Sequence, residues 1–219
     1  DQVSLIKKIL KDKNIDSKKF SPNYIKSKIG FLKNEMTTFE EMRKTMRTTI
    51  DKIVVDVYME YENILHKSNA IDFDDLLLKP VRLLLNNDEV LDRYQEHYPY
   101  ILVDEYQDTN PVQYRFTKVL SEKYRNIFVV GDMNQSIYSF RQADYRNILN
   151  FERDFRDTRV IKLEQNYRST QIILDAANDV IKNNKEKKDL KLWSSRKEGS
   201  LINYLRAYDG NHEIKLVVD

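Results

Sequence analysis

Cysteine is absent from this 219-residue sequence, and glycine and proline are scarce, with four of each. Without cysteine the chain has no disulfide framework, which fits a reducing compartment, so we expect a cytoplasmic protein. The few glycines and prolines exclude a loop-rich or low-complexity chain. No apolar run reaches the roughly 18 residues of a membrane-spanning helix, so we expect no membrane partner.

A large excess of charge of one sign is also missing, because the net charge is only +2 although 33% of the residues are charged. A bulk polycation is therefore excluded, and any affinity for nucleic acid must come from local patches. The three histidines are scattered and show no metal-ligand spacing. A glycine-rich phosphate loop of the form GxxxxGK[ST] is absent as well. The length of 219 residues allows one large or two small domains, and 41% of apolar residues is enough for a sizeable core.

The stretch around which the chain is organised holds two short apolar runs, at residues 100–103 and 127–130. Runs of this length that are rich in valine and isoleucine predict buried strands. Between them we expect a helix, with Asn110 as its N-cap and Pro111 at its first position. A strand, a helix and a strand at this spacing predict a βαβ unit with parallel strands.

Acidic residues follow both predicted strands: Asp104 and Glu105 after the first, Asp132 after the second, with Gln135 close by. Ligands of open α/β sheets bind outside the carboxyl ends of the strands, so these four side chains should meet at one edge. One carboxylate can hold Mg²⁺ and another can accept a proton from an attacking water. The alternative is an acidic loop of solvated turn formers.

Three ordered motifs, VDEYQDTN, VVGDMNQSIYSFRQAD and LEQNYRST, together with IDFDDLL at residues 71–77, carry a family resemblance. They resemble motifs of the superfamily-one DNA helicases of the UvrD/PcrA/Rep type, nearest to the PcrA branch, and the resemblance is close over residues 71–182. It implies an α/β fold with RecA-like parallel-sheet motor domains. We expect part of a helical accessory domain at 1–70, part of the first RecA-like ATPase domain at 71–158 and the start of a second at 159–219.

The same resemblance implies an internal segment of a longer helicase, without the N-terminal phosphate-binding loop and the C-terminal motifs. In the second motor domain we expect strands at residues 160–163 and 201–205. The helix between them, at 170–182, should face inward with the apolar residues Ile172, Ile173, Ala176, Ala177 and Val180.

For ATP and Mg²⁺ the resemblance implies a role for each acidic-edge residue. Asp104 would hold Mg²⁺, Glu105 would activate water and Gln135 would sense the γ-phosphate, with Asp132 among the nucleotide-binding residues. From the second motor domain, Tyr167 would stack on adenine and Arg168 would act as an arginine finger. A surface charge is the plainer interpretation of an arginine in a loop.

For DNA the resemblance points to aromatic side chains. Phe73 would stack on a base of single-stranded DNA, although the residues alone favour a core position for it. Tyr138 and Phe140 alternate, so on an extended segment they point the same way and form a stacking platform, unless both pack in the core. Arg141 matches an arginine that links the ATP and DNA sites. Gln142 departs from the family's usual glycine, at a position where the backbone can require positive φ.

Residues 17–34 contain five lysines and no acid. This run is either a solvated face or a contact surface for duplex DNA phosphates. The leading functional interpretation is a fragment of an ATP-dependent helicase that translocates on single-stranded DNA, 3′ to 5′, and unwinds duplex DNA in repair or replication. Protein partners from those pathways are not identified by the sequence. The alternatives are a non-catalytic DNA- or partner-binding module, or the helicase subunit of a recombination nuclease.

Overall fold

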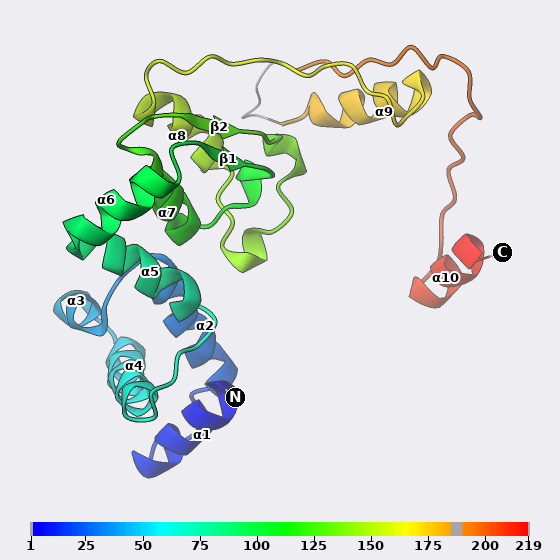
Figure 1. Ribbon diagram of the computed structural model, residues 1–219. Helices are drawn as coiled ribbons and strands as arrows, with labels where there is room; N and C mark the ends of the chain where they lie inside the picture. Colours follow the sequence, from blue (N-terminus) through cyan, green and yellow to red (C-terminus); the bar gives the residue numbers. More distant parts are fainter. Residues whose placement is uncertain (1, 185–189, 219) are drawn as a thin grey trace. The chain divides into compact units, whose positions relative to one another are not determined.

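The computed structural model describes residues 2–184 and 190–218 (Figure 1). Its contacts divide the chain into two compact units, Asp1–Asp157 and Thr158–Asp219, which are described separately below. Among the described residues, no helix combines the length and the apolar character that a membrane crossing requires. The described part of the chain is largely helical and contains one small parallel sheet.

The first unit begins with a group of helices around one apolar core (Figure 1): α1 (Gln2–Asp12), α2 (Pro22–Asn34), α3 (Phe39–Thr45) and α4 (Thr49–Lys67). Capping boxes start α3 at Thr38 and α4 at Thr48, where each threonine side chain accepts from the backbone three residues later. Side chains from α1, α2 and α4 fill the core: Ile6, Ile9, Leu10, Ile25, Ile29, Val54, Val57, Tyr58 and Tyr61.

Three further helices follow, α5 (Asp75–Asn86), α6 (Asp88–His97) and α7 (Pro111–Ser121), and they share a second core that includes Leu84 and Val119. Strands β1 (Ile101–Val103) and β2 (Ile127–Val129) pair in parallel, with Leu102 opposite Phe128. Asn110 caps α7 through a capping box, and Pro111 is its first residue. The predicted βαβ unit is therefore confirmed.

The prediction that both strands are buried is wrong for one face of the sheet. Leu102 is 74% exposed and Phe128 is 58% exposed, because side chains alternate along a strand and point to opposite faces. On the other face, Val103 and Val129 pack against a third core that contains Phe151 of α8 (Arg146–Asp154). Among the described residues, helices therefore cover only the face of the sheet that carries Val103 and Val129.

The second unit contains α9 (Gln171–Ile181) and α10 (Gly210–Val218). The strands expected at 160–163 and 201–205 are wrong, because both segments are irregular and exposed. A strand needs the hydrogen bonds of a neighbour, and the pairing described in this unit is one isolated parallel bridge between Gln165 and Trp193.

The expected inward face of α9 is also partly wrong. Leu174 is its buried residue, while Ile173 and Val180 are at least half exposed. Within the described residues of this unit, no sheet is present for that face to cover. The domain borders expected at residues 70/71 and 158/159 stay predictions.

Candidate functional site

The loops after the two parallel strands form what we call the acidic edge: Asp104, Glu105, Asp132 and Gln135. The backbone N–H of Val130 donates to Val103 O at 2.9 Å, and the N–H of Tyr106 donates to Val130 O at 2.9 Å. These two bonds extend the pairing of β1 and β2 into the loops. The structure therefore holds both acidic loops at the same end of the sheet, as the βαβ topology predicts.

Glu105 has a left-handed backbone, with φ 49° and ψ 44°. Its N–H donates to Asp104 Oδ1 at 2.9 Å, so the Asp104 carboxylate is fixed at a sharp turn. A non-glycine residue in this region costs about 1–3 kcal/mol, and such strain concentrates at functional sites. The turn continues into the short 3₁₀ helix η1 (Tyr106–Asp108).

Gln107 joins the two loops, and it is not among the site residues predicted from the sequence. It is only 1% exposed. Its Nε2 donates to Glu105 Oε2 at 2.8 Å, and its Oε1 accepts from the N–H of Asp132 at 3.1 Å. A Cβ on Gly131 would lie 2.6 Å from Gln107 Oε1, so the glycine permits this close approach. The sequence signal for Gln107 was its position two residues after Glu105, in the turn that follows the acidic pair.

Asp132 and Gln135 form one hydrogen-bonded unit at the start of the 3₁₀ helix η2 (Met133–Gln135). Asp132 Oδ1 accepts from the N–H of Asn134 at 2.9 Å, and Oδ2 accepts from Gln135 Nε2 at 3.0 Å. Through Gln107, this unit is connected to Glu105. Four of the predicted nucleotide-site residues therefore belong to two linked loops.

The predicted extended segment around Tyr138 and Phe140 is wrong. Residues Ser139–Arg141 form the 3₁₀ helix η3, and Gln142 ends it with φ 66°, which confirms the positive φ expected there. The N–H of Gln142 donates to Ser139 O at 2.9 Å, so the chain turns instead of running straight. The two aromatic rings still lie together, with centroids 5.9 Å apart and a tilt of 51°. The side chain of Arg141 lies outside the described part of the structure.

Phe73 and Phe140 are not core residues, since they are 84% and 75% exposed, while Tyr138 is 38% exposed. Large aromatic side chains at this level of exposure are available for stacking on a ligand. Their contact with DNA stays a prediction.

Tyr167 and Arg168 lie in the loop before α9 of the second unit, and both side chains are exposed. Asn166 Oδ1 accepts from the N–H of Arg168 at 2.9 Å and from that of Ser169 at 2.7 Å, which fixes the loop backbone. Arg196 donates to the carbonyl oxygen of Arg168 at 3.0 Å. The guanidinium of Arg168 is thus presented by an ordered turn.

The lysine run at 17–34 does not behave as one surface. Lys18, Lys19, Lys26 and Lys28 are exposed, whereas Lys33 is fully buried. Both interpretations offered for the run are therefore wrong for Lys33. Its carboxylate partners are separated from it by dozens of residues, so the absence of acid within the run was misleading.

Comparison with known proteins places the chain among helicases. The sequence profile of the UvrD/REP helicase N-terminal domain matches residues 1–156, and that of the UvrD-like helicase C-terminal domain matches residues 161–219. The chain belongs to the UvrD/REP helicase family. The acidic edge lies within the N-terminal UvrD/REP match, and Tyr167 and Arg168 lie within the C-terminal match.

Relatives within the UvrD/REP family carry the name ATP-dependent DNA helicase PcrA. The protein from Bacillus subtilis is 50% identical over 206 residues, which cover 94% of this chain. The Staphylococcus aureus and Staphylococcus epidermidis proteins are each 46% identical over 218 residues. The chain spans about 28–30% of the length of these relatives.

Proposed function

We propose that this chain forms part of the motor of an ATP-dependent DNA helicase that translocates on single-stranded DNA, 3′ to 5′, and unwinds duplex DNA. The observation that carries the proposal is the acidic edge, in which Gln107 ties Glu105 to Asp132 and its partner Gln135. Membership of the UvrD/REP helicase family supports it. We assign residues 1–70 to the accessory region, 71–158 to the first RecA-like domain and 159–219 to the second.

The donor set of the acidic edge fits Mg²⁺ with ATP. Asp104 Oδ1 accepts a hydrogen bond from the N–H of Glu105. Among the residues that the structure describes, no ion pair involves the carboxylate of Asp104 or of Glu105. Mg²⁺ prefers one or two carboxylates together with phosphate oxygens, and Asp104 would hold it. Bound Mg²⁺ supplies positive charge against the phosphates.

The chain's own residues would then divide the remaining work. Glu105 accepts the proton of the attacking water, and the amide of Gln107 orients its carboxylate. Gln135 contacts the γ-phosphate, and Asp132 fixes the Gln135 amide through Oδ2. Arg168 donates to transition-state charge and Tyr167 stacks on the adenine. Phe73, Tyr138 and Phe140 stack on bases, and Arg141 relates the two sites.

Phosphate release with and without single-stranded DNA tests this function. In a full-length helicase that carries this sequence, Glu105→Gln should lower turnover about 10²- to 10⁴-fold, because glutamine keeps the shape but cannot take a proton. ATP affinity should change little. Glu122→Gln, at an exposed glutamate just after α7, is the matched control and should leave turnover unchanged.

A second candidate is a non-catalytic DNA- or partner-binding module, and the absent GxxxxGK[ST] loop favours it for the 219-residue chain alone. The isolated chain should hydrolyse ATP negligibly. DNA-stimulated turnover by the isolated chain would contradict this expectation, and near-normal hydrolysis by Glu105→Gln would remove Glu105 from the mechanism.

A further inference from the structure

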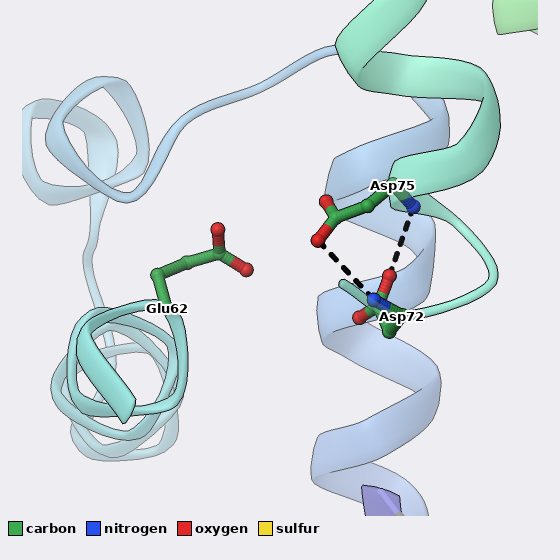
Figure 2. A group of neighbouring side chains, drawn as sticks. All are labelled: Glu62, Asp72 and Asp75. Carbon is green, nitrogen blue, oxygen red and sulfur yellow. Dashed lines mark hydrogen bonds between the residues drawn. The ribbon is translucent and has the colours of Figure 1, made fainter. Parts of the chain in front are cut away.

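A buried ion cluster connects the first helices to the start of α5. Lys33 Nζ lies 2.7 Å from Glu62 Oε1, 2.8 Å from Asp72 Oδ2 and 2.9 Å from Asp75 Oδ1. We call these four residues the closed cluster. Figure 2 shows Glu62 extending from α4 toward the two aspartates. The three carboxylates have the spacing of a cation site, and the ammonium group of Lys33 is the cation that they share.

The ion pairs of the closed cluster offset the cost of burying Lys33 and Asp72. Burial by itself lowers the pKa of the Lys33 ammonium, but hydrogen bonds to the three carboxylates outweigh this effect and raise the pKa above its ordinary value. Burial raises the pKa of the Asp72 carboxyl, and Lys33 more than compensates and holds it below its usual value. Tyr61 OH also donates to Asp72 Oδ2 at 2.9 Å.

The same two aspartates form a reciprocal box at the start of α5 (Figure 2). The N–H of Asp75 donates to Asp72 Oδ1 at 2.9 Å, and the N–H of Asp72 donates to Asp75 Oδ2 at 3.4 Å. This is the geometry of a capping box, in which two residues three apart satisfy each other's backbone. Phe73 and Asp74 are the residues enclosed by the box, so the backbone of Phe73 is fixed from both sides.

Helix α2 holds all three aspartates that surround Phe73. Lys33 binds Asp72 and Asp75, and Asn34 Nδ2 donates to Asp74 Oδ1 at 3.3 Å. Gly30 lets α2 approach, because a Cβ there would lie 3.3 Å from Asp74 Oδ2. Within this turn, residues 72–75, Phe73 is the exposed residue, at 84%, while Asp72 and Asp75 are buried and Asp74 is half-buried.

We propose that Lys33 is a positioning residue for single-stranded DNA, which acts by fixing the turn that presents Phe73 to a base. The proposal rests on the DNA-binding part of the proposed function. Stability alone is a weak reason for such a cluster, because apolar replacements of buried ion pairs are often neutral or stabilising. A preorganised aromatic ring loses less conformational freedom on binding, which strengthens stacking.

A double-mutant cycle in a full-length helicase that carries this sequence tests the proposal, with the affinity for fluorescently labelled oligo(dT) as the readout. Phe73→Ala should weaken binding by about 5- to 150-fold, the value of one base stack. Lys33→Met should also weaken binding, by a factor equal to or smaller than that of Phe73→Ala. The double variant should bind no more weakly than Phe73→Ala alone, because Lys33 acts through Phe73.

Phe140→Ala provides the control cycle, because Phe140 is exposed and belongs to the separate turn η3. Its loss should multiply with that of Lys33→Met, since independent sites are additive in free energy. If Lys33→Met does not fold, the variant Lys33→Met/Asp72→Asn/Asp75→Asn replaces it, because it leaves no unpaired aspartate charge in the box. Circular dichroism melting keeps every binding measurement below the melting temperature.

The possible outcomes distinguish a failure of the role of Lys33 from a failure of the proposed function. Unchanged DNA affinity in a folded Lys33 variant, alongside a loss in Phe73→Ala, overturns the role of Lys33 and leaves the proposed function intact. If the loss of DNA affinity in Lys33→Met multiplies equally with the losses in Phe73→Ala and Phe140→Ala, Lys33 acts on the fold in general. That result also overturns the positioning role of Lys33. No loss of affinity in either Phe73→Ala or Phe140→Ala removes the DNA-stacking part of the proposed function, and the inference with it.

Discussion

The closed cluster and the acidic edge are two groups of carboxylates in the same unit, and they differ in the charge of their hydrogen-bond partners. In the closed cluster a lysine lies within 2.7–2.9 Å of all three carboxylates. At the acidic edge the described partners are neutral: backbone N–H groups and the side-chain amides of Gln107 and Gln135. Neutral donors orient a carboxylate without cancelling its charge. The closed cluster already contains a cation, and the contrast supports the proposal that the acidic edge binds a cationic ligand.

The largest effect should come from Arg168, which we propose as the arginine finger. In a full-length helicase that carries this sequence, Arg168→Ala should lower turnover by about 10³-fold or more, as expected for an arginine finger. ATP binding should suffer less, because the finger acts most strongly on transition-state charge. Arg168→Lys should rescue poorly, since lysine lacks the planar fork.

Turnover and ATP affinity would be measured side by side for both variants, with Arg206→Ala, at another exposed arginine of the second unit, as the control. Equal losses in affinity and turnover would make Arg168 a plain binding residue. No loss in either would make it a surface charge, and the acidic edge would then need another source of positive charge.

The second-largest effect should be a difference in the free energy of unfolding between a variant of the closed cluster and a variant of the acidic edge. Asp75→Asn should lower the free energy of unfolding by about 3–5 kcal/mol, because it leaves a buried ion cluster incomplete. Asp104→Asn keeps the oxygen that accepts from Glu105 and should change stability by less than about 0.5 kcal/mol. Urea unfolding followed by circular dichroism gives both values. Similar losses for the two variants would show that the acidic edge is structural as well.

The smallest effect should come from Gln107, which links the loops of the acidic edge. Gln107→Met removes the side-chain hydrogen bonds to Glu105, Asp108 and Asp132 at nearly constant volume. It should lower kcat by up to about 10²-fold through misplacement of Glu105. ATP affinity should be largely retained, and the loss should not add to that of Glu105→Gln. Gln95→Met is the matched control, because Gln95 is another buried glutamine, bonded to Val119 O at 2.8 Å. Equal losses in the two variants would point to packing instead.

Local signals in the sequence predicted the parts of the fold that depend on near neighbours. Asn110 and Pro111 were sufficient to place the start of α7, because capping and the fixed φ of proline act within one turn. The parallel strands followed from the length of the connection between them. The convergence of Asp132 and Gln135 was predicted for the same reason, since it depends on topology and on a three-residue spacing.

The missed features depend on contacts between distant segments or on partners along a sheet. Lys33 was assigned to the surface because its partners Asp72 and Asp75 are 39 and 42 residues away. The apolar segments at 160–163 and 201–205 have the composition of strands, but composition cannot supply the neighbour that a strand requires. The 3₁₀ turn at η3 is an exception with a local cause: the positive φ of Gln142 was expected, but the alternation of Tyr138 and Phe140 was interpreted as an extended segment.

The sequence separation within the closed cluster also has a consequence for the order of folding. The cluster cannot form until loops of 39 and 42 residues have closed, whereas α2 and α4 need only local contacts. Interactions that are absent from the folding transition state act on the unfolding rate. The Asp75→Asn variant should therefore unfold faster and refold at nearly the same rate in stopped-flow measurements. The ion pairs of Lys33 would then form late in folding and slow the separation of α2, α4 and α5.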